Sequence, residues 1–288
     1  MNSGHAVTVA AIGDEDINRA AAFLHRHLND RVTPEKWAAG ISTPWQPQPP
    51  NHGYMLLDGT EIVGVNLAFY STREVSGAAQ KFCNLGALCV LEPWRARTLR
   101  LVRKLLSQKG YTFTDFSPSG AVVELNRRLG FADIDTTTRI NLNLPWPASS
   151  EATVTSRSSI IRSTLSPADL QLYEDHSSSP AASHILLRRT DGYCYVITRR
   201  DRRKGLPVFA SLLYVSDPSL FKRYAHQLFS AILTRTGAPA TLVEKRLVDD
   251  AWRTSVKLAS ARPKMIKSSS VAPDEVDYLY SELTQIAW

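Results

Sequence analysis

The chain has 288 residues, a length that suits two modest domains or one large one and can bury a substantial core. Its 43% hydrophobic and 21% charged residues are typical of a folded soluble protein and exclude collagen-like and fully disordered chains. The net charge of +7 is mild for a nucleic-acid binder, and a small anionic ligand fits it equally well.

No stretch of the sequence predicts a membrane span or a disulfide framework. Apolar runs fall well short of the roughly 20 residues that cross a bilayer, and the apolar stretch at positions 6–12 lacks a basic leader and a cleavage site. The three cysteines, Cys83, Cys89 and Cys194, form no CxxC pair, which argues against disulfides or a zinc site. We therefore expect a cytoplasmic protein without a metal, in which the cysteines are buried thiols.

Helical and strand patterns alternate through the first 140 residues. Acidic residues at 14–16 precede a helical repeat of apolar positions, and Thr33 followed by Pro34 is typical of a second helix start. Asp58-Gly59 between two apolar runs predicts a β-hairpin. The expected elements are helices at 14–29, from 34, 99–106 and 122–129, and strands at 54–57, 62–70, 84–91 and 111–116.

A polar, proline-punctuated stretch at 144–159 predicts a linker, with a domain boundary near residue 148. Beyond it the order of elements recurs, although residue identity between the halves is low, so we expect a repeated architecture rather than a sequence repeat. The expected elements are helices from 166 and at 219–234, and strands at 184–189, 193–199, 208–215 and 241–247. The amphipathic segment 276–283 is most simply a docking segment.

The most informative unit runs from Glu92 to Phe131. A strand ends at Glu92-Pro93 and leads into a helix, whose N-terminal amides and dipole favour an anion such as a pyrophosphate. Positions 95–106 carry five cations and no carboxylate. A solvated basic helix face has the same spacing, so the pattern alone leaves both interpretations open.

These residues resemble the GNAT superfamily, the acyl-CoA-dependent N-acyltransferases. Pro93-Trp94-Arg95 and Leu129-Gly130-Phe131 match the family's two motifs at about the expected separation. The resemblance covers about the first 140 residues, and the second half looks like a divergent copy. It implies an α/β (α+β) protein of two tandem GNAT-like domains, residues 1–148 and 149–288, each a mixed central sheet flanked by helices.

The resemblance implies that acetyl-CoA or another acyl-CoA is the co-substrate. The pantetheine arm would lie along the third predicted strand, and an amide of that strand would stabilise the oxyanion. The diphosphate would lie at the arginine-rich junction. The cofactor-binding residues expected from the resemblance are Leu88, Cys89, Val90, Arg95, Ala96, Arg97, Thr98, Leu99 and Arg100.

The resemblance also implies an amine or hydroxyl acceptor that enters beside the first two helices, with Trp37, Trp45 and Asn84 as pocket walls. Glu92 or Glu61 would accept the amine proton through water. Asn126 and its neighbour Leu125 fall where the family often has a general-acid tyrosine, so the leaving thiolate would take its proton from water, Ser117 or Ser119. The candidate catalytic residues are Glu92, Ser117 and Asn126.

Two departures from the family pattern keep an alternative open. Ala96, Thr98 and Arg100 stand where the family has glycines, and the tyrosine is absent. The alternative is a non-catalytic GNAT-like module that acts as a ligand-binding or interaction scaffold. A nucleic-acid binder is the third hypothesis. The basic run 199–204 predicts a solvated hairpin tip, with a contact for an acidic partner or a membrane surface as the alternative. The expected partner is a small-molecule acceptor, and a homodimer is compatible with the sequence.

Overall fold

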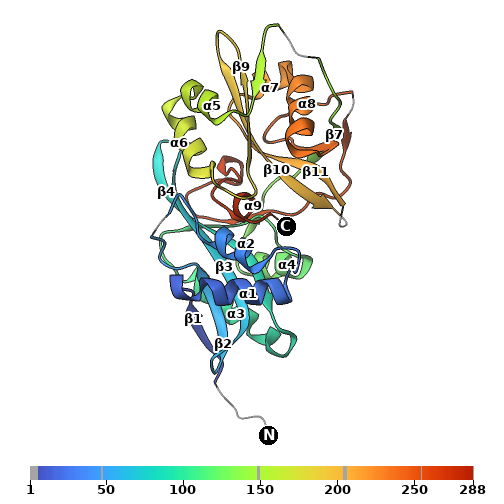
Figure 1. The fold of residues 1–288 in the computed structure, drawn as a ribbon. Coiled ribbons are helices and arrows are strands. Elements are labelled where there is room, and N and C mark those ends of the chain that lie inside the picture. Colours follow the sequence, from blue (N-terminus) through green and yellow to red (C-terminus); the bar gives the residue numbers. More distant parts are fainter. Residues whose placement is uncertain (1–5, 47, 148–149, 204–205, 254, 288) are drawn as a thin grey trace.

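The computed structural model describes residues 6–46, 48–147, 150–203, 206–253 and 255–287. These residues form two seven-stranded mixed sheets, each flanked by helices in its own half of the molecule (Figure 1). The predicted architecture of two mixed-sheet units is therefore confirmed. Within the described ranges, no helix combines the length and the apolar character that crossing a bilayer requires.

The first sheet has the order β1-β2-β3-β4-β5-β14-β6. Its described strands are antiparallel except for the pair β4 and β5, which is parallel. The strands are β1 (Thr8–Ala11), β2 (Gly53–Asp58), β3 (Glu61–Val75), β4 (Ala78–Val90), β5 (Thr112–Asp115), β6 (Ala132–Asp133) and β14 (Met265–Lys267). The helices of this half are α1 (Ile17–His27), α2 (Pro34–Ile41), α3 (Thr98–Leu106) and α4 (Gly120–Arg128), with 3-10 turns at Asp14–Asp16 and Glu92–Arg97.

Local sequence signals account for these elements. The Thr33 hydroxyl accepts a hydrogen bond from the Lys36 amide and caps α2, as the Thr-Pro pattern predicts. Gly59 adopts a φ of 61° in the hairpin turn between β2 and β3. Helix α3 buries one apolar face, with Leu101, Val102 and Leu105 under the sheet and its arginines outside.

The second sheet repeats the arrangement in the order β8-β9-β10-β11-β12-β7-β13, again with one parallel pair, β11 and β12, among its described strands. The strands are β7 (Thr138–Leu142), β8 (Thr153–Thr155), β9 (Ser183–Arg188), β10 (Tyr193–Arg203), β11 (Leu206–Val215), β12 (Ala240–Glu244) and β13 (Ser255–Lys257). The helices are α5 (Ser158–Thr164), α6 (Pro167–His176), α7 (Pro218–Arg223) and α8 (Ala225–Thr236), followed by a 3-10 turn at Pro273–Glu275 and by α9 (Glu282–Gln285).

Two local predictions need correction. The helix expected at 219–234 is two helices, because Tyr224 leaves helical geometry between α7 and α8. The stretch 144–159 contains more than a linker: β8 lies in it and forms the edge of the second sheet by pairing with β9. Residues 148 and 149, at the predicted boundary, lie outside the described residues.

The two sheets exchange strands. Strand β7 precedes the predicted boundary but pairs with β12 and β13 in the second sheet. Strand β14 comes from the end of the chain and pairs with β5 and β6 in the first sheet. The two units are therefore tied together by backbone pairing, while a division at residue 148 stays a prediction.

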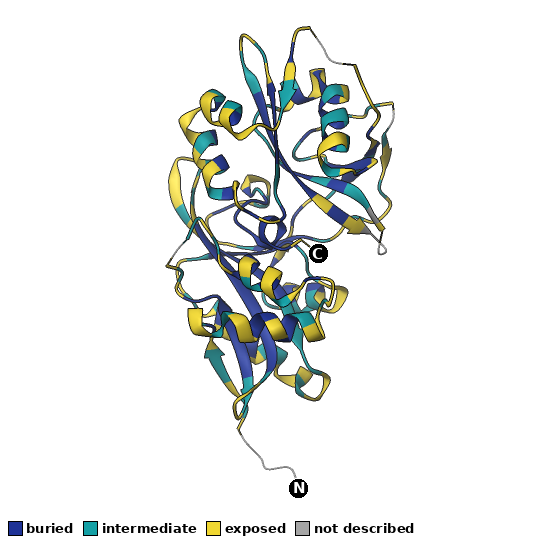
Figure 2. Ribbon diagram, viewed as in Figure 1, coloured by how far each residue is buried: buried dark blue, intermediate teal, exposed yellow. Residues whose placement is uncertain are grey.

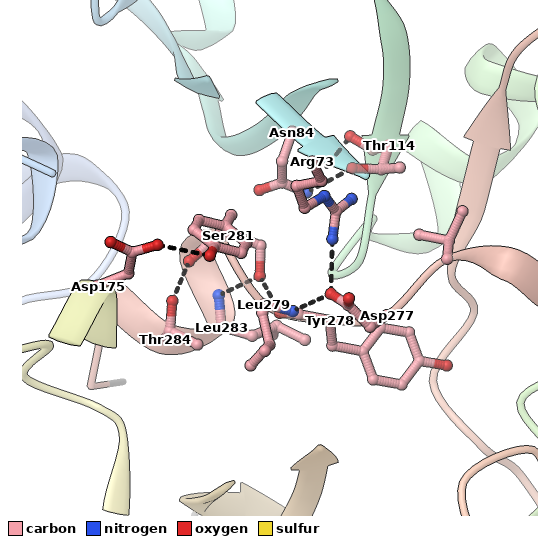
Figure 3. Close-up of polar contacts among 12 residues, drawn as sticks. Arg73, Asn84, Thr114, Asp175, Asp277, Tyr278, Leu279, Ser281, Leu283 and Thr284 are labelled. Carbon is pink, nitrogen blue, oxygen red and sulfur yellow. Dashed lines mark hydrogen bonds and ion pairs between the residues drawn. The ribbon is translucent and has the colours of Figure 1, made fainter. Parts of the chain in front are cut away.

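The C-terminal segment, residues 276–286, lies between the two sheets (Figures 1 and 2). Most of its side chains are buried, including Tyr278, Leu279 and Leu283. Figure 3 shows how polar groups hold it: Arg73 from β3 donates to Asp277 at 2.5 Å. The fully buried Arg199 of β10 donates to the carbonyls of Leu283 and Ile286. The segment is thus an integral part of the core between the units.

Candidate active-site cleft

A cleft opens where the parallel strands β4 and β5 part. They pair from Phe82 to Leu85 against Thr112 to Asp115, and β4 then continues to Val90 without a described strand on that side. A cavity of about 520 Å³ lies there, lined by Gly86, Ala87 and Leu88 of β4. The end of α1, the middle of α3, the loop before α4 and α4 itself complete its walls. A groove bounded by unpaired strand backbone suits an elongated ligand with amide groups.

A β-bulge shapes the wall of this cleft. Leu67 of β3 faces Gly86 of β4, but Val65 faces Cys89, so β4 has one more residue than β3 over this interval. Within the bulge Ala87 adopts a φ of 51°, a left-handed conformation that is uncommon for residues other than glycine. The bulge bends β4 and changes the direction of its amide groups where the strand borders the cavity.

Two buried side-chain amides border the cavity with unused hydrogen-bonding groups. Asn66 of β3 is 1% exposed, and neither its Nδ2 nor its Oδ1 has a partner within the described chain. Asn126 of α4 donates to Asp115 at 2.8 Å, but its Oδ1 is unpartnered there. Because a buried polar group without a partner costs about 1–3 kcal/mol, these atoms are available to a polar ligand or to water in the cavity.

Two buried carboxyl groups lie beside the cleft in different protonation environments. Asp115 ends β5, accepts from Asn126, and has its pKa raised to about 6 by burial. Glu282 of α9 reaches β4 because Gly86 has no side chain: a Cβ there would lie 3.1 Å from the Glu282 Cβ. Burial and the charge of Asp115 raise the pKa of Glu282 to about 8. The Ser117 hydroxyl lies 2.8 Å from Glu282 Oε1, and Ser117 itself lines the cavity.

The arginine-rich junction after β4 lies on the surface. The turn 92–97 leads directly into α3, and no described side chain caps either N-terminus. Arg95 is largely exposed and lies 3.8 Å from Glu92, while Arg100 donates to the carbonyl of Val7. The junction therefore presents guanidinium groups to solvent at the end of β4, beside the positive end of the α3 dipole.

The structure brings together some of the predicted site residues and separates others. Leu88, Ser117, Ser119 and Asn126 line the cavity. Cys89 and Val90 continue along β4, where the Cys89 thiol is half-buried, lies 3.6 Å from the carbonyl of His27 and has a pKa raised by burial. The residues of the junction lie outside the described lining of the cavity: Glu92, Arg95, Ala96, Arg97, Thr98, Leu99 and Arg100.

The three residues predicted to line the acceptor pocket, Trp37, Trp45 and Asn84, lie outside the described lining of the cavity. Trp37 is fully buried in the core between α1, α2 and the sheet, which excludes it as an open pocket wall. Trp45 packs against His176 and Tyr280 between the two units. Asn84 donates to Thr114 (Figure 3) and accepts from the backbone amide of Glu282, and it is not part of the described cavity lining. Asn84 therefore holds α9 in place. The predicted buried thiols are confirmed for Cys83 and Cys194.

Sequence reasoning missed Asn66, Asp115 and Glu282. A weak signal existed for Asp115, a carboxylate at the carboxyl end of an apolar strand. Asn66 interrupts the apolar run of β3 and was treated as part of a strand pattern. Glu282 is 167 positions after Asp115, and its place beside the cleft depends on how the C-terminal segment packs.

Comparisons with known proteins show the fold. No protein-family model and no curated protein matches the sequence. Among solved structures, a GCN5-related N-acetyltransferase from Anabaena variabilis is 10% identical with a TM-score of 0.58, covering 90% of this chain and 72% of that chain. A proposed acetyltransferase from Pyrococcus horikoshii is 14% identical with a TM-score of 0.58, covering 100% and 96%.

A further match is a structure solved with an acyl-CoA. N-myristoyltransferase from Saccharomyces cerevisiae, solved with bound myristoyl-CoA, is 10% identical with a TM-score of 0.52, covering 99% of this chain and 86% of that chain. The chain therefore has a GNAT-like acyltransferase fold. At these identities the matches establish the fold, and the chemistry must be argued from the cleft.

Proposed function

We propose that the protein is an acyl-CoA-dependent acyltransferase that moves an acyl group to an amine or hydroxyl, with the β4–β5 cleft as its active site. The observation that carries the proposal is the cleft itself: bulged strand backbone along a cavity of about 520 Å³, bordered by the side-chain amide of Asn66 and by Asn126 Oδ1, neither of which has a partner among the described residues. The GNAT-like fold supports it, because the matched proteins include acetyltransferases and a structure with bound myristoyl-CoA.

The cleft fits the chemistry of an acyl-CoA. The pantetheine arm carries two amides, which find partners in β4 backbone and in the side chains of Asn66 and Asn126. The diphosphate lies at the junction after β4, where Arg95, Arg97 and Arg100 supply cations and the start of α3 supplies the positive end of its helix dipole. In proteins with glycines at these positions the backbone amides can come close to the diphosphate; here the arginine side chains would bind it instead.

Two carboxyl groups with separated pKa values supply the proton transfers. The acceptor nitrogen attacks the thioester carbon, an amide of β4 holds the oxyanion, and Asp115 takes the proton that the nitrogen loses. The C–S bond then breaks, and the thiolate receives a proton from Ser117, which is resupplied by protonated Glu282. A proton passes back from Asp115 to Glu282 to restore the starting state.

Ligand-induced stabilisation tests this proposal. A ligand at about 100 times its dissociation constant stabilises a protein by roughly 2.7 kcal/mol, so saturating acetyl-CoA or a longer acyl-CoA is expected to raise the Tm. Ser119→Trp places a large side chain at the cavity from an exposed position and is expected to remove most of that increase. Ser107→Trp, exposed at the end of α3 and outside the cavity lining, is the matched control.

The outcomes separate two functions. Release of CoA thiol with an amine panel supports transfer. Binding of CoA without turnover favours the ligand-binding scaffold. The glycines and the general-acid tyrosine of the family pattern, which this sequence does not have, also favour that alternative. Absence of any stabilisation by millimolar acyl-CoA would refute both the cofactor and the proposed site.

A further inference from the structure

Three arginines from three separate segments line the cavity. Arg31 follows α1, Arg202 lies near the end of β10, and Arg262 precedes β14. Arg31 and Arg202 are exposed. These residues belong to the region that connects the cleft with the second unit, and none is part of the junction after β4. The sheet exchange therefore brings cations from both units to one cavity.

The arginine from the last segment is held in a fixed position. Arg262 donates to Asp201 Oδ1 at 3.0 Å and also to the backbone carbonyl of Arg202. Asp201 is 7% exposed and accepts from Ser211 at 3.0 Å. This network ties β10 to the segment before β14, so the guanidinium group of Arg262 is held in place before a ligand binds.

The described lining of the cavity contains more basic than acidic side chains. Its described lining contains the three arginines and one carboxyl, Asp115, whose buried site disfavours the charged form. Asp201 neutralises Arg262 through their ion pair. Guanidinium groups thus outnumber carboxyl groups in the described lining, on the side of the cavity formed by the residues after α1.

The residues of the basic run 199–204 have different surroundings: some are buried and others are exposed. It was interpreted as a solvated hairpin tip, but Arg199 is buried under the C-terminal segment and Asp201 is buried beneath Arg262. Arg202 is exposed and lines the cavity. Residues 204 and 205 lie outside the described residues.

We infer that the acceptor carries an anionic group, a carboxylate or a phosphate, that Arg31, Arg202 and Arg262 recognise. This inference rests on the proposed transferase function and defines its substrate class. The α3 junction provides a separate cationic surface for the phosphates of CoA. Guanidinium groups bind carboxylate and phosphate with paired, charge-assisted hydrogen bonds. An anionic acceptor would therefore be selected both by its charge and by the geometry of these bonds.

Matched amines test the inference. O-phosphoethanolamine is compared with ethanolamine, and tyrosine with tyramine, by calorimetric binding with and without CoA and by turnover with acetyl-CoA. At least one anionic amine is expected to bind at least tenfold more tightly than its neutral-tailed counterpart. In Arg202→Ala and Arg31→Ala this preference should fall at least fivefold, while the Kd of CoA changes less than twofold.

The control variant is Arg188→Ala, which removes an equal charge at the opposite end of β10, where Arg188 pairs with Tyr193. It should keep the preference. Equal binding of both members of each amine pair by the unaltered protein would overturn the inference. So would a parallel loss of CoA affinity in Arg202→Ala, because the arginines would then hold the phosphates of CoA. Anionic-amine binding in a protein that does not bind CoA would support anion recognition and refute the transferase.

Discussion

The two sheets have the same strand order and the same parallel pair, yet their clefts differ. In the first sheet β4 and β5 part around a cavity of about 520 Å³. In the second, β11 and β12 pair only from Phe209 to Ser211 against Ala240 to Leu242. Beyond that point Tyr278 and Leu279 of the C-terminal segment join the core with Leu213, and a cavity of about 50 Å³ remains beside them.

The helix that follows each cleft strand shows the same contrast. After β4, α3 begins without a described side-chain cap and among arginines. After β11, Asp217 caps α7 by accepting from the amides of Ser219 and Leu220 at 2.9 Å. An N-terminus already satisfied by its own carboxylate repels a second anion. The repeated fold thus keeps one open cleft and fills the other with its own chain.

The largest effect is expected from releasing the segment that fills the second cleft. Arg199→Met keeps an apolar stem but removes the donors to the carbonyls of Leu283 and Ile286. We expect a loss of about 3 kcal/mol in the free energy of unfolding, because buried acceptors lose their partner. Urea denaturation measures it. Arg200→Met, exposed on the same strand, should change stability by less than about 0.5 kcal/mol. Equal effects of the two variants would show that Arg199 does not hold the segment.

The burial of Arg199 shows which features of the fold could be predicted from the sequence and which could not. Signals within a few residues, such as Asp58-Gly59 and Thr33-Pro34, predicted the hairpin and the α2 start because their causes are local. The burial of Arg199 depends on carbonyls 84 and 87 residues away, so its neighbours in sequence gave no indication of it. The strand exchange is equally non-local.

The same limit applies to the candidate site. Leu88, Ser117 and Asn126 were predicted from their place in the family pattern and do line the cavity. Glu282 was missed because it lies near Asp115 only when the C-terminal segment packs between the two sheets. The Ala87 bulge was missed because nothing in an apolar strand of small residues marks a left-handed φ.

A pair of buried asparagines, one beside each sheet, sharpens the comparison. The side-chain amide of Asn66 borders the open cleft without a partner among the described residues, whereas Asn143 donates to Ala238 at 2.7 Å and accepts from Thr241 at 2.8 Å. Asn66→Leu should stabilise the free protein by about 1 kcal/mol and weaken acyl-CoA binding about tenfold, while Asn143→Leu should cost about 1–3 kcal/mol. Denaturation and calorimetry measure both. Destabilisation by Asn66→Leu with unchanged CoA affinity would contradict a ligand-facing amide.

The smallest effects concern the starts of α7 and α3. A substitution at α7 should change stability but not acyl-CoA binding, and a substitution before α3 should change acyl-CoA binding but not stability. Asp217→Ala removes the α7 cap and should cost about 1 kcal/mol of stability without changing acyl-CoA binding. Arg95→Ala removes an exposed side chain and should leave stability within about 0.5 kcal/mol. Its acyl-CoA affinity should nevertheless fall roughly threefold at low salt and less at high salt, since the lost contact is a screened charge pair. Calorimetric titrations at two salt concentrations measure the difference. If Arg95→Ala binds acyl-CoA normally at low salt, the diphosphate lies elsewhere than at the start of α3.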